Sequence, residues 1–302
     1  MRVAGAIDIG GTRTKLGVIA EDGRILDRGI VSTPASGDPV PLVEAISAKF
    51  KPMLDASGYA ERSGETLVGV GVSVAGFLNR EHTSMFANAN LPLLIGFPLR
   101  RELEHRLGRS CLLEVDSNTA AIAEYRFGSG RASQRLLGVT IGTGFGGGVV
   151  VAGQLLRHTG ECAGDLGHII LDPSGRRCTC GAHGCLEALV CSAALSERAG
   201  GKSVRDVVKD ANAGDERALN AIRETARWLG LGLASLVPLF TPDTIVVGGG
   251  VAAAGELLLE PVRASFGAHA GDDYQDVRIA GSKLEGWEGM LGAASLVFVP
   301  LD

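Results

Sequence analysis

The segment Asp8-Ile9-Gly10-Gly11-Thr12-Arg13-Thr14-Lys15 joins two apolar stretches that predict a pair of antiparallel strands, and it decides the fold of the chain. Glycine lets the backbone approach a ligand closely, and consecutive backbone N–H groups form a nest that binds an anion. Thr12 and Thr14 add hydroxyl donors, and Asp8 can hold a magnesium ion through water. A plain hairpin turn is the alternative, but an Asp, two Gly and two Thr in one turn favour a phosphate-binding loop.

A second glycine-rich turn, Gly142-Thr143-Gly144-Phe145-Gly146-Gly147-Gly148, also lies between two predicted strands. Three of its glycines satisfy the dinucleotide pattern G-x-G-x-x-G, but that pattern requires a helix after the turn, and Val149–Val151 predicts a strand. This argues against a nicotinamide-dependent oxidoreductase. Gly201-Lys202-Ser203 does not end a P-loop, because Ser196 stands where that motif requires Gly. The two similar turns suggest two related domains that face each other.

The composition predicts a two-domain globular protein that binds neither nucleic acid nor a membrane. The 302 residues are too many for the commonest single domain, and 45% of them are apolar. The net charge of -5 lacks the basic excess of a nucleic-acid-binding protein. Asp8 interrupts the apolar start too early for a signal peptide, and the glycines of the uncharged stretch 136–156 disfavour a membrane helix. We therefore expect a cytoplasmic protein whose cysteines stay reduced.

The segment Glu114-Val115-Asp116-Ser117-Asn118 carries a carboxylate from the end of a predicted strand to the start of a predicted helix. An Asp in this position is often only a helix cap. In a chain with two phosphate-binding loops, however, a carboxylate that accepts a proton from a hydroxyl group is the part that phosphoryl transfer still requires. We therefore predict that Asp116 is the general base.

A cluster of cysteines predicts a structural zinc site. Three cysteines lie within one short segment: Cys178, Cys180 and Cys185. Three thiolates and one imidazole complete a closed tetrahedral site, and His168 and His183 compete for the fourth position. In the sequence, His168 lies between two acids, Asp165 and Glu187. A zinc ion that fixes His168 would therefore also fix a polar pocket suited to a polyol.

With these motifs the chain resembles the ROK family of bacterial sugar kinases and sugar-responsive repressors. The resemblance covers nearly the whole chain, and it also rests on Val246-Val247-Gly248-Gly249-Gly250. It implies an α/β fold of the actin-like (ribonuclease H-like) class, a two-domain ATPase fold with an interdomain cleft. The expected N-terminal domain spans residues 1–116 and is completed by a C-terminal helix at about 289–302. The larger C-terminal domain, residues 117–288, is expected to carry the zinc site.

The resemblance also implies roles for individual residues. ATP and magnesium are expected at Asp8, Gly10, Gly11, Thr12, Thr14, Lys15, Gly142, Thr143, Gly144, Gly248, Gly249 and Gly250. The sugar is expected at Asn90, Asp116, Asp165, His168 and Glu187, with Asp116 as the catalytic base. Structural zinc is expected at His168, Cys178, Cys180 and Cys185. We also expect a homodimer or a higher homo-oligomer.

Several positions depart from the pattern of the glucokinases in this family. Val115 stands where Asn is usual, Asp165 where Glu is usual, and Ala75-Gly76 where Pro-Gly is usual. Each change removes or shortens a polar contact to the sugar. The first interpretation is ATP-dependent phosphorylation of a hexose at its 6-hydroxyl, and the second is an N-acetylmannosamine or N-acetylglucosamine kinase. Repressors of the family carry a helix-turn-helix before the first motif, and the seven residues before Asp8 disfavour that class.

Overall fold

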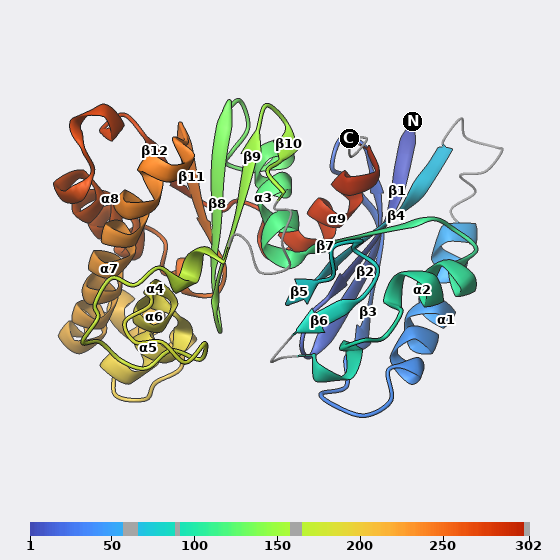
Figure 1. Cartoon of the computed structure of the whole chain (residues 1–302), viewed down its shortest axis with the longest axis horizontal. Helices are drawn as coiled ribbons and strands as arrows, with labels where there is room; N and C mark the ends of the chain where they lie inside the picture. Colours follow the sequence, from blue (N-terminus) through green and yellow to red (C-terminus); the bar gives the residue numbers. More distant parts are fainter. Residues whose placement is uncertain (57–65, 88–90, 158–164, 299–302) are drawn as a thin grey trace. The chain divides into compact units, whose positions relative to one another are not determined.

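The chain folds into two compact α/β units (Figure 1). The computed structural model describes residues 1–56, 66–87, 91–157 and 165–298. The first unit consists of Met1–Phe127, Arg157–Ala163 and Leu284–Asp302, and the second of Gly128–Leu156 and Gly164–Lys283. This confirms the α/β class expected from the sequence.

The first unit is built on a five-stranded sheet of order β3-β2-β1-β4-β7. Strands β1, β2 and β3 pair antiparallel, whereas β4 pairs parallel with both β1 and β7. The elements are β1 (Arg2–Ile9), β2 (Arg13–Ala20), β3 (Ile25–Ser32), α1 (Val40–Ala56), β4 (Thr66–Val74), β5 (Phe77–Leu78), β6 (Met85–Ala87), η1 (Pro92–Leu94), α2 (Leu99–Leu107), β7 (Cys111–Val115), α3 (Asp116–Phe127) and α9 (Glu288–Phe298).

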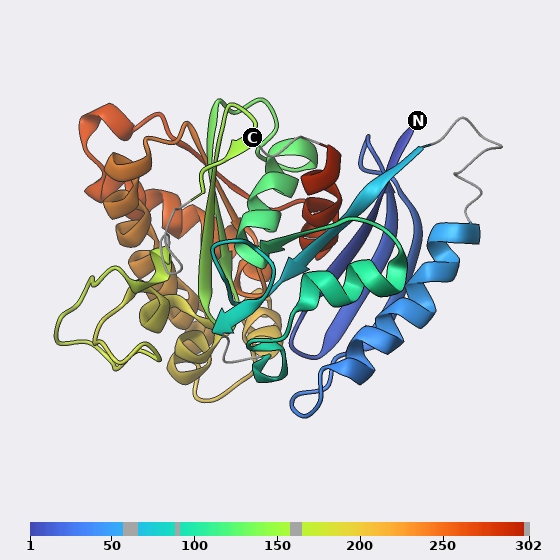
Figure 2. The same cartoon turned by 45° about the vertical axis from the view of Figure 1, so that its right-hand side comes forward.

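Strand β1 is buried on both faces because helices cover both sides of the sheet. Val3 and Ile7 belong to the core that α1 and α2 form on one face, and Ala4 and Ala6 belong to the core around α9 on the other. Figure 2 shows α9 and α3 side by side against this sheet. The residues that face α9 are small because that helix packs very closely: a side chain at Gly71 would collide with the backbone of α9.

The second unit repeats this plan with a sheet of order β10-β9-β8-β11-β12. Strands β8 and β9 form an antiparallel hairpin, and β11 pairs parallel with both β8 and β12. The elements are β8 (Arg135–Ile141), β9 (Phe145–Val151), β10 (Gln154–Leu155), η2 (Leu166–His168), α4 (Leu186–Val190), α5 (Ser192–Arg198), α6 (Val204–Asn212), α7 (Glu216–Phe240), β11 (Thr244–Gly248), η3 (Val251–Ala254), α8 (Glu256–His269), η4 (Asp272–Tyr274) and β12 (Arg278–Gly281).

The division between the units differs from the boundary near Ser117 that the sequence predicts. Helix α3 packs against β4, β7 and α9, so it belongs to the first unit, and the chain enters the second unit only after Phe127. The C-terminal segment Leu284–Asp302 belongs to the first unit. Helices α4 and α5 are separated by a single residue, Cys191.

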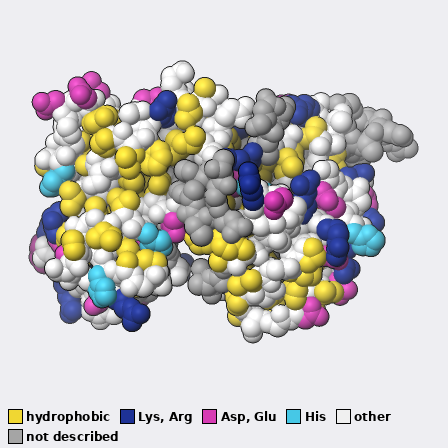
Figure 3. Space-filling model, viewed as in Figure 1, with side chains coloured by type: hydrophobic (Ala, Val, Ile, Leu, Met, Phe, Trp, Pro, Cys, Tyr) yellow, Lys and Arg dark blue, Asp and Glu magenta, His cyan; other side chains and the backbone are white. Residues whose placement is uncertain are grey.

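The surface agrees with the modest net charge. On the face shown in Figure 3, Lys and Arg side chains are interspersed with acidic and apolar ones rather than gathered in a basic stripe. Among the described residues, no helix combines the length and the apolar character that crossing a bilayer requires.

Candidate functional site

In the first unit, carboxylates gather at the end of the sheet where the parallel strands finish. In the strand register Asp8 lies opposite Ser73, and Ser73 lies opposite Glu114. Asp116 follows directly after the end of β7. Because parallel strands all end at one edge of their sheet, the phosphate hairpin after β1 and the predicted base after β7 share that edge.

Asp116 is exposed, and its backbone is firmly held. Its carboxylate Oδ1 accepts a hydrogen bond from the adjacent Ser117 amide at 2.8 Å, not from an amide two or three residues further on as in an N-cap. The Thr119 hydroxyl donates to the Asp116 carbonyl at 2.8 Å and contacts the Ser73 hydroxyl at 2.9 Å. Desolvation by the surrounding protein and the nearby charge of Asp8 raise the pKa of the Asp116 carboxyl to about 6.

Asp8 is held between a cation and a glycine. Its Oδ2 lies 3.3 Å from Lys15 Nζ, which also donates to the Gly286 carbonyl at 2.8 Å and lies over the Trp287 ring. A Cβ atom at Gly289 would lie 2.5 Å from Asp8 Oδ1, so glycine is needed there to leave room for the carboxylate. The Asp8 carboxylate therefore already neutralises the Lys15 ammonium group. A hydrated magnesium ion would have to share this carboxylate with Lys15.

The hairpin from Gly10 to Lys15 was expected to bind phosphate with the hydroxyls of Thr12 and Thr14, and only one of these two hydroxyls is accessible. Thr12 is exposed at the turn, where its hydroxyl is free to reach a ligand. Thr14 is fully buried, and its Oγ1 lies 2.8 Å from the Thr33 hydroxyl. The expectation that the Thr14 side chain donates to a phosphate is therefore not supported, because this hydroxyl is buried against Thr33.

In the second unit, the turn from Gly142 to Gly144 closes the β8–β9 hairpin. Hydrogen bonds from a residue outside the hairpin hold this turn in place. The Gly142 carbonyl accepts bonds from both the amide and the hydroxyl of Ser192, each at 2.8 Å. Thr143 is exposed at the tip, and no atom lies within 4 Å of a Cβ placed at Gly142. The turn is thus fixed by α5 while one side of it faces open space, as a phosphate-binding loop requires.

Gly248, Gly249 and Gly250 lie beside this turn. Gly248 pairs with Thr140 at the end of β8. Gly249 has a φ of +87°, and a Cβ atom there would lie 2.7 Å from the Ile141 amide nitrogen, so only glycine fits. Space is open around Gly250. The two glycine segments therefore end neighbouring strands at one edge of this sheet.

Glu187 connects the glycine turn to the cysteine segment. Its Oε2 accepts a hydrogen bond from the Phe145 amide at 2.9 Å and would lie 2.7 Å from a Cβ atom at Gly144. Its Oε1 accepts a bond from the Thr179 hydroxyl at 3.1 Å. The sequence indicated only a sugar contact for this acid. A carboxylate has about four acceptor positions, so a sugar hydroxyl can still bind here.

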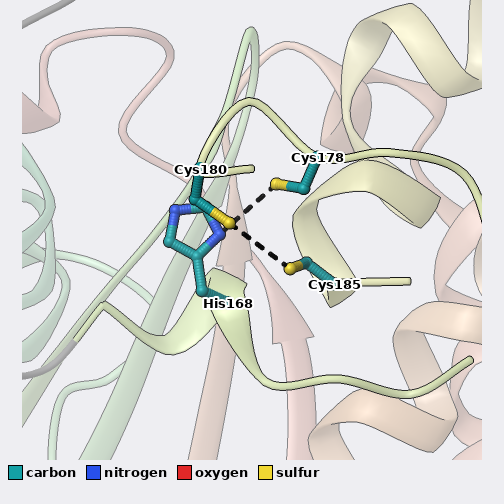
Figure 4. Close-up of side chains that lie close together, drawn as sticks. All are labelled: His168, Cys178, Cys180 and Cys185. Atoms are coloured by element: carbon teal, nitrogen blue, oxygen red, sulfur yellow. Dashed lines mark hydrogen bonds between the residues drawn. The ribbon is translucent and has the colours of Figure 1, made fainter. Parts of the chain in front are cut away.

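Four side chains form a cluster suited to a metal ion (Figure 4): His168, Cys178, Cys180 and Cys185. Their ligand atoms all lie within 4.8 Å of one another. The cluster contains His168 and not His183, which decides between the two histidines left open by the sequence. The five cysteines that the structure describes are all free thiols.

The distances within this cluster match a tetrahedral zinc site. With Zn–S bonds of about 2.3 Å and Zn–N bonds of about 2.0–2.1 Å, two sulfur ligands lie about 3.8 Å apart, and sulfur and nitrogen about 3.6 Å apart. Cys180 Sγ and Cys185 Sγ are 3.7 Å apart, and Cys178 Sγ and His168 Nδ1 are 3.5 Å apart. The residues present therefore fit zinc.

Asp165 supports the histidine of this cluster. Its Oδ2 lies 3.2 Å from His168 Nε2, while Nδ1 of the same ring faces Cys178. A proton on Nε2 that is donated to Asp165 leaves the Nδ1 lone pair free for a metal, and such carboxylate–histidine pairs are common behind metal ligands. The sequence suggested that Asp165 faces the sugar and did not indicate this second role.

A buried acid behind Asp116 was also not foreseen. Glu114 is fully buried, and its carboxylate accepts bonds from Arg157 Nε at 3.0 Å, the Val115 amide at 2.9 Å and Asn118 Nδ2 at 3.1 Å. These bonds fix the turn from β7 into α3 on which Asp116 lies. The one available signal was a Glu two residues before Asp116. The predicted sugar residue Asn90 lies outside the described residues.

Comparison with known proteins gives consistent matches over most of the chain. A protein-family model described as ROK family matches residues 4–299. A glucokinase of Streptomyces coelicolor is 33% identical, with 97% of each chain covered, and an N-acetylmannosamine kinase of Escherichia coli is 36% identical, with 82% of each covered. The crystal structure of a ROK family glucokinase from Streptomyces griseus in complex with glucose and AMPPNP gives a TM-score of 0.81 at 33% identity. That match covers 97% of this chain and 98% of the other.

Asp165→Asn tests the support of His168. The substitution keeps the size of the side chain but removes its charge, so we expect zinc affinity to fall about 10–100-fold, as is typical for loss of such a supporting carboxylate. Competition with a chromophoric chelator measures this affinity. Asp272→Asn, in the same unit but outside the cluster, is the control. Equal affinity in the Asp165 variant and the wild type would show that Asp165 does not orient the ligand.

Proposed function

Because this chain belongs to the ROK family, we propose that it is an ATP-dependent sugar kinase that phosphorylates the 6-hydroxyl of a hexose, with glucose as substrate. The observation that carries the mechanism is the carboxylate of Asp116. It is exposed at the edge of the sheet that also carries the phosphate hairpin, and its pKa of about 6 suits a base that works near neutral pH. The kinase relatives cover nearly the whole chain, which supports the activity.

Phosphate binding rests on backbone groups rather than on cations. The turns at Gly10–Thr12 and Gly142–Gly144 offer N–H groups to the phosphates of ATP, and Gly248–Gly250 provide space for its nucleoside. Lys15 adds one positive charge beside Asp8. Magnesium, when bound, neutralises charge on the β- and γ-phosphates, and Asp8 is the residue that would hold its water shell.

Asp116 drives the chemical step by removing a proton. Its carboxylate accepts the proton of the sugar hydroxyl while the hydroxyl oxygen attacks the γ-phosphorus in line. The bond from that phosphorus to the β–γ bridging oxygen breaks, and its electron pair leaves with ADP. The proton remains on Asp116 until solvent removes it. The Ser117 amide holds the carboxylate, and the Thr119 hydroxyl holds the Asp116 backbone carbonyl.

The zinc site has a structural role in this proposal. His168, Cys178, Cys180 and Cys185 would hold the ion, which closes the segment that leads into α4. Glu187 lies in the first turn of that helix and reaches the Phe145 amide. The same ligand set therefore fixes a predicted sugar-binding acid and the glycine turn together.

The identity of the sugar depends on a small number of polar groups. Asp165 and Glu187 lie close to His168 in the second unit, and their carboxylates offer acceptors for hydroxyl groups. The match to a glucokinase covers more of the chain than the match to an N-acetylmannosamine kinase, which favours glucose. N-acetylmannosamine is the second candidate because Asp165 is shorter than the Glu expected from the glucokinase pattern, which leaves room for an N-acetyl group.

Coupled detection of ADP release tests the activity and the substrate in one experiment. With magnesium and ATP, we expect sugar-dependent ADP formation whose kcat/KM is highest for glucose among glucose, mannose, fructose, allose, N-acetylglucosamine and N-acetylmannosamine. A higher kcat/KM for N-acetylmannosamine would assign the second substrate. Absence of ADP formation with every sugar would contradict the kinase proposal.

Asp116→Asn and a pH profile test the base. The amide cannot accept the proton, so we expect kcat to fall by at least about 100-fold with little change in sugar affinity. In the wild type the carboxyl becomes protonated below its pKa of about 6, so kcat/KM should fall about tenfold per pH unit there. The residual rate of Asp116→Asn should lack this acid limb, which separates titration of Asp116 from titration of ATP. A variant that keeps more than a tenth of the wild-type kcat would exclude Asp116 as the base.

A further inference from the structure

We propose that the second unit carries a separate anion-binding site that takes a small phosphorylated sugar. The site is a cavity of about 540 Å³ beside β12, within the usual size range of small-molecule pockets. None of the residues assigned above to ATP, the sugar or zinc lines it. The choice of a sugar phosphate as ligand rests on the proposed function, since that reaction makes one.

The cavity forms where a loop covers the edge strand of the sheet. Strand β12 is the last strand on its side, and the loop after α3 lies against it. The Arg278 guanidinium donates to the Ser129 carbonyl at 2.6 Å, and the Ser129 hydroxyl donates to the Gly281 carbonyl at 2.6 Å. From α8, Arg263 Nε donates to the Ile279 carbonyl at 2.9 Å. The walls of the cavity are therefore tied to one another through hydrogen bonds.

More cationic than carboxylate side chains line this cavity. Arg263 is paired with Glu256 at 2.6 Å, and the Asp243 carboxylate accepts bonds from two backbone amides at 2.7 and 2.9 Å. That leaves Arg131 and Lys283, whose side chains have no hydrogen-bond or ion-pair partner in the described part of the chain. The charge on each therefore has no local counter-ion.

Arg278 is the third uncompensated cation. It donates only to neutral oxygens, the Ser129 carbonyl and, at 3.4 Å, the Thr244 hydroxyl. Like charges gathered on one cavity repel one another, and a bound dianion would relieve that repulsion. In a chain of net charge -5, this local excess of positive charge indicates a site for an anion. A phosphate group matches the fork of an arginine particularly well.

The rest of the lining indicates the body of the ligand. None of the described residues that line the cavity is aromatic, so it offers no surface on which a nucleobase would stack. Hydroxyl groups of Ser129, Ser133 and Thr244 and the carboxylates of Asp243 and Glu256 offer acceptors to a polyol. A phosphate group with a polyhydroxylated body therefore fits these residues better than a nucleotide does.

Two further features distinguish this cavity from an ordinary surface hollow. Ala132 has a φ of 69°, a left-handed conformation that costs free energy for a residue with a Cβ and that is enriched at ligand sites. Gly128 and Lys283, the first and last residues of the second unit, both line the cavity. The cavity therefore adjoins two of the places where the chain passes between the units.

Calorimetric titration of the full chain, without ATP or magnesium, tests this site. The probes are glucose 6-phosphate and inorganic phosphate. We expect glucose 6-phosphate to bind at least tenfold more tightly than inorganic phosphate. Because sugar phosphate can also enter the catalytic site, Arg131→Glu and Lys283→Glu identify the cavity: each should weaken binding at least tenfold. Arg205→Glu, an exposed arginine of the same unit outside the cavity, is the control and should bind like the wild type.

Three results would overturn the proposal. They are the absence of binding, binding that both cavity variants retain, and equal affinity for the two probes. Thermal melting of both variants checks that they fold, which we expect because each side chain is exposed and unpaired in the described structure. Sugar-dependent ADP release is measured separately on the same proteins, so failure of the kinase proposal would be distinguished from failure of this one.

Discussion

The second unit depends on the carboxylate of Glu187, which is bound on one side to the glycine turn and on the other to the cysteine segment. One oxygen accepts the Phe145 amide, and the other accepts the Thr179 hydroxyl between two of the cysteines. Ser192 holds the first end of this turn, at the Gly142 carbonyl, whereas Glu187 holds its other end, at Phe145, and joins it to a cysteine segment with little regular structure. A metal ion bound at the cysteine cluster would therefore also act, through Glu187, on the position of the glycine turn.

Both units contain a glycine-containing hairpin that could bind an anion through backbone N–H groups. Each places a glycine-containing hairpin at the edge where its parallel strands end, so that backbone N–H groups can meet an anion without a large positive charge. They differ in what surrounds the hairpin. In the first unit, the buried Glu114 is bonded to Arg157 and fixes the turn that carries the exposed Asp116. In the second, a histidine and thiols support the loops. In the proposed mechanism, the first unit would supply the proton acceptor and the second a platform that a metal ion would support.

The sequence predicted most of what depends on local pattern. Both glycine hairpins, the strand-to-helix turn at Asp116 and the three clustered cysteines follow from residue type and spacing, and the structure contains each of them. The choice of His168 over His183 as the fourth member of the cluster came from the family resemblance and not from spacing. It did not indicate that Thr14 is buried against Thr33 or that Asp165 supports His168, because those contacts depend on which side chains the fold brings together. Helix α8 and strand β12 were not predicted either. Pro261 and Gly267 interrupt the helical pattern of α8, and β12 is only four residues long.

Hydrogen exchange at the Phe145 amide measures the link through Glu187 most directly. If the carboxylate joins the metal cluster to the glycine turn, removing the metal with a chelator should speed exchange of this amide at least tenfold in the wild type. In Glu187→Ala the amide should exchange rapidly with or without metal, and the exposed control Glu260→Ala should behave like the wild type. An amide that stays equally protected after metal removal, and in Glu187→Ala, would contradict this account.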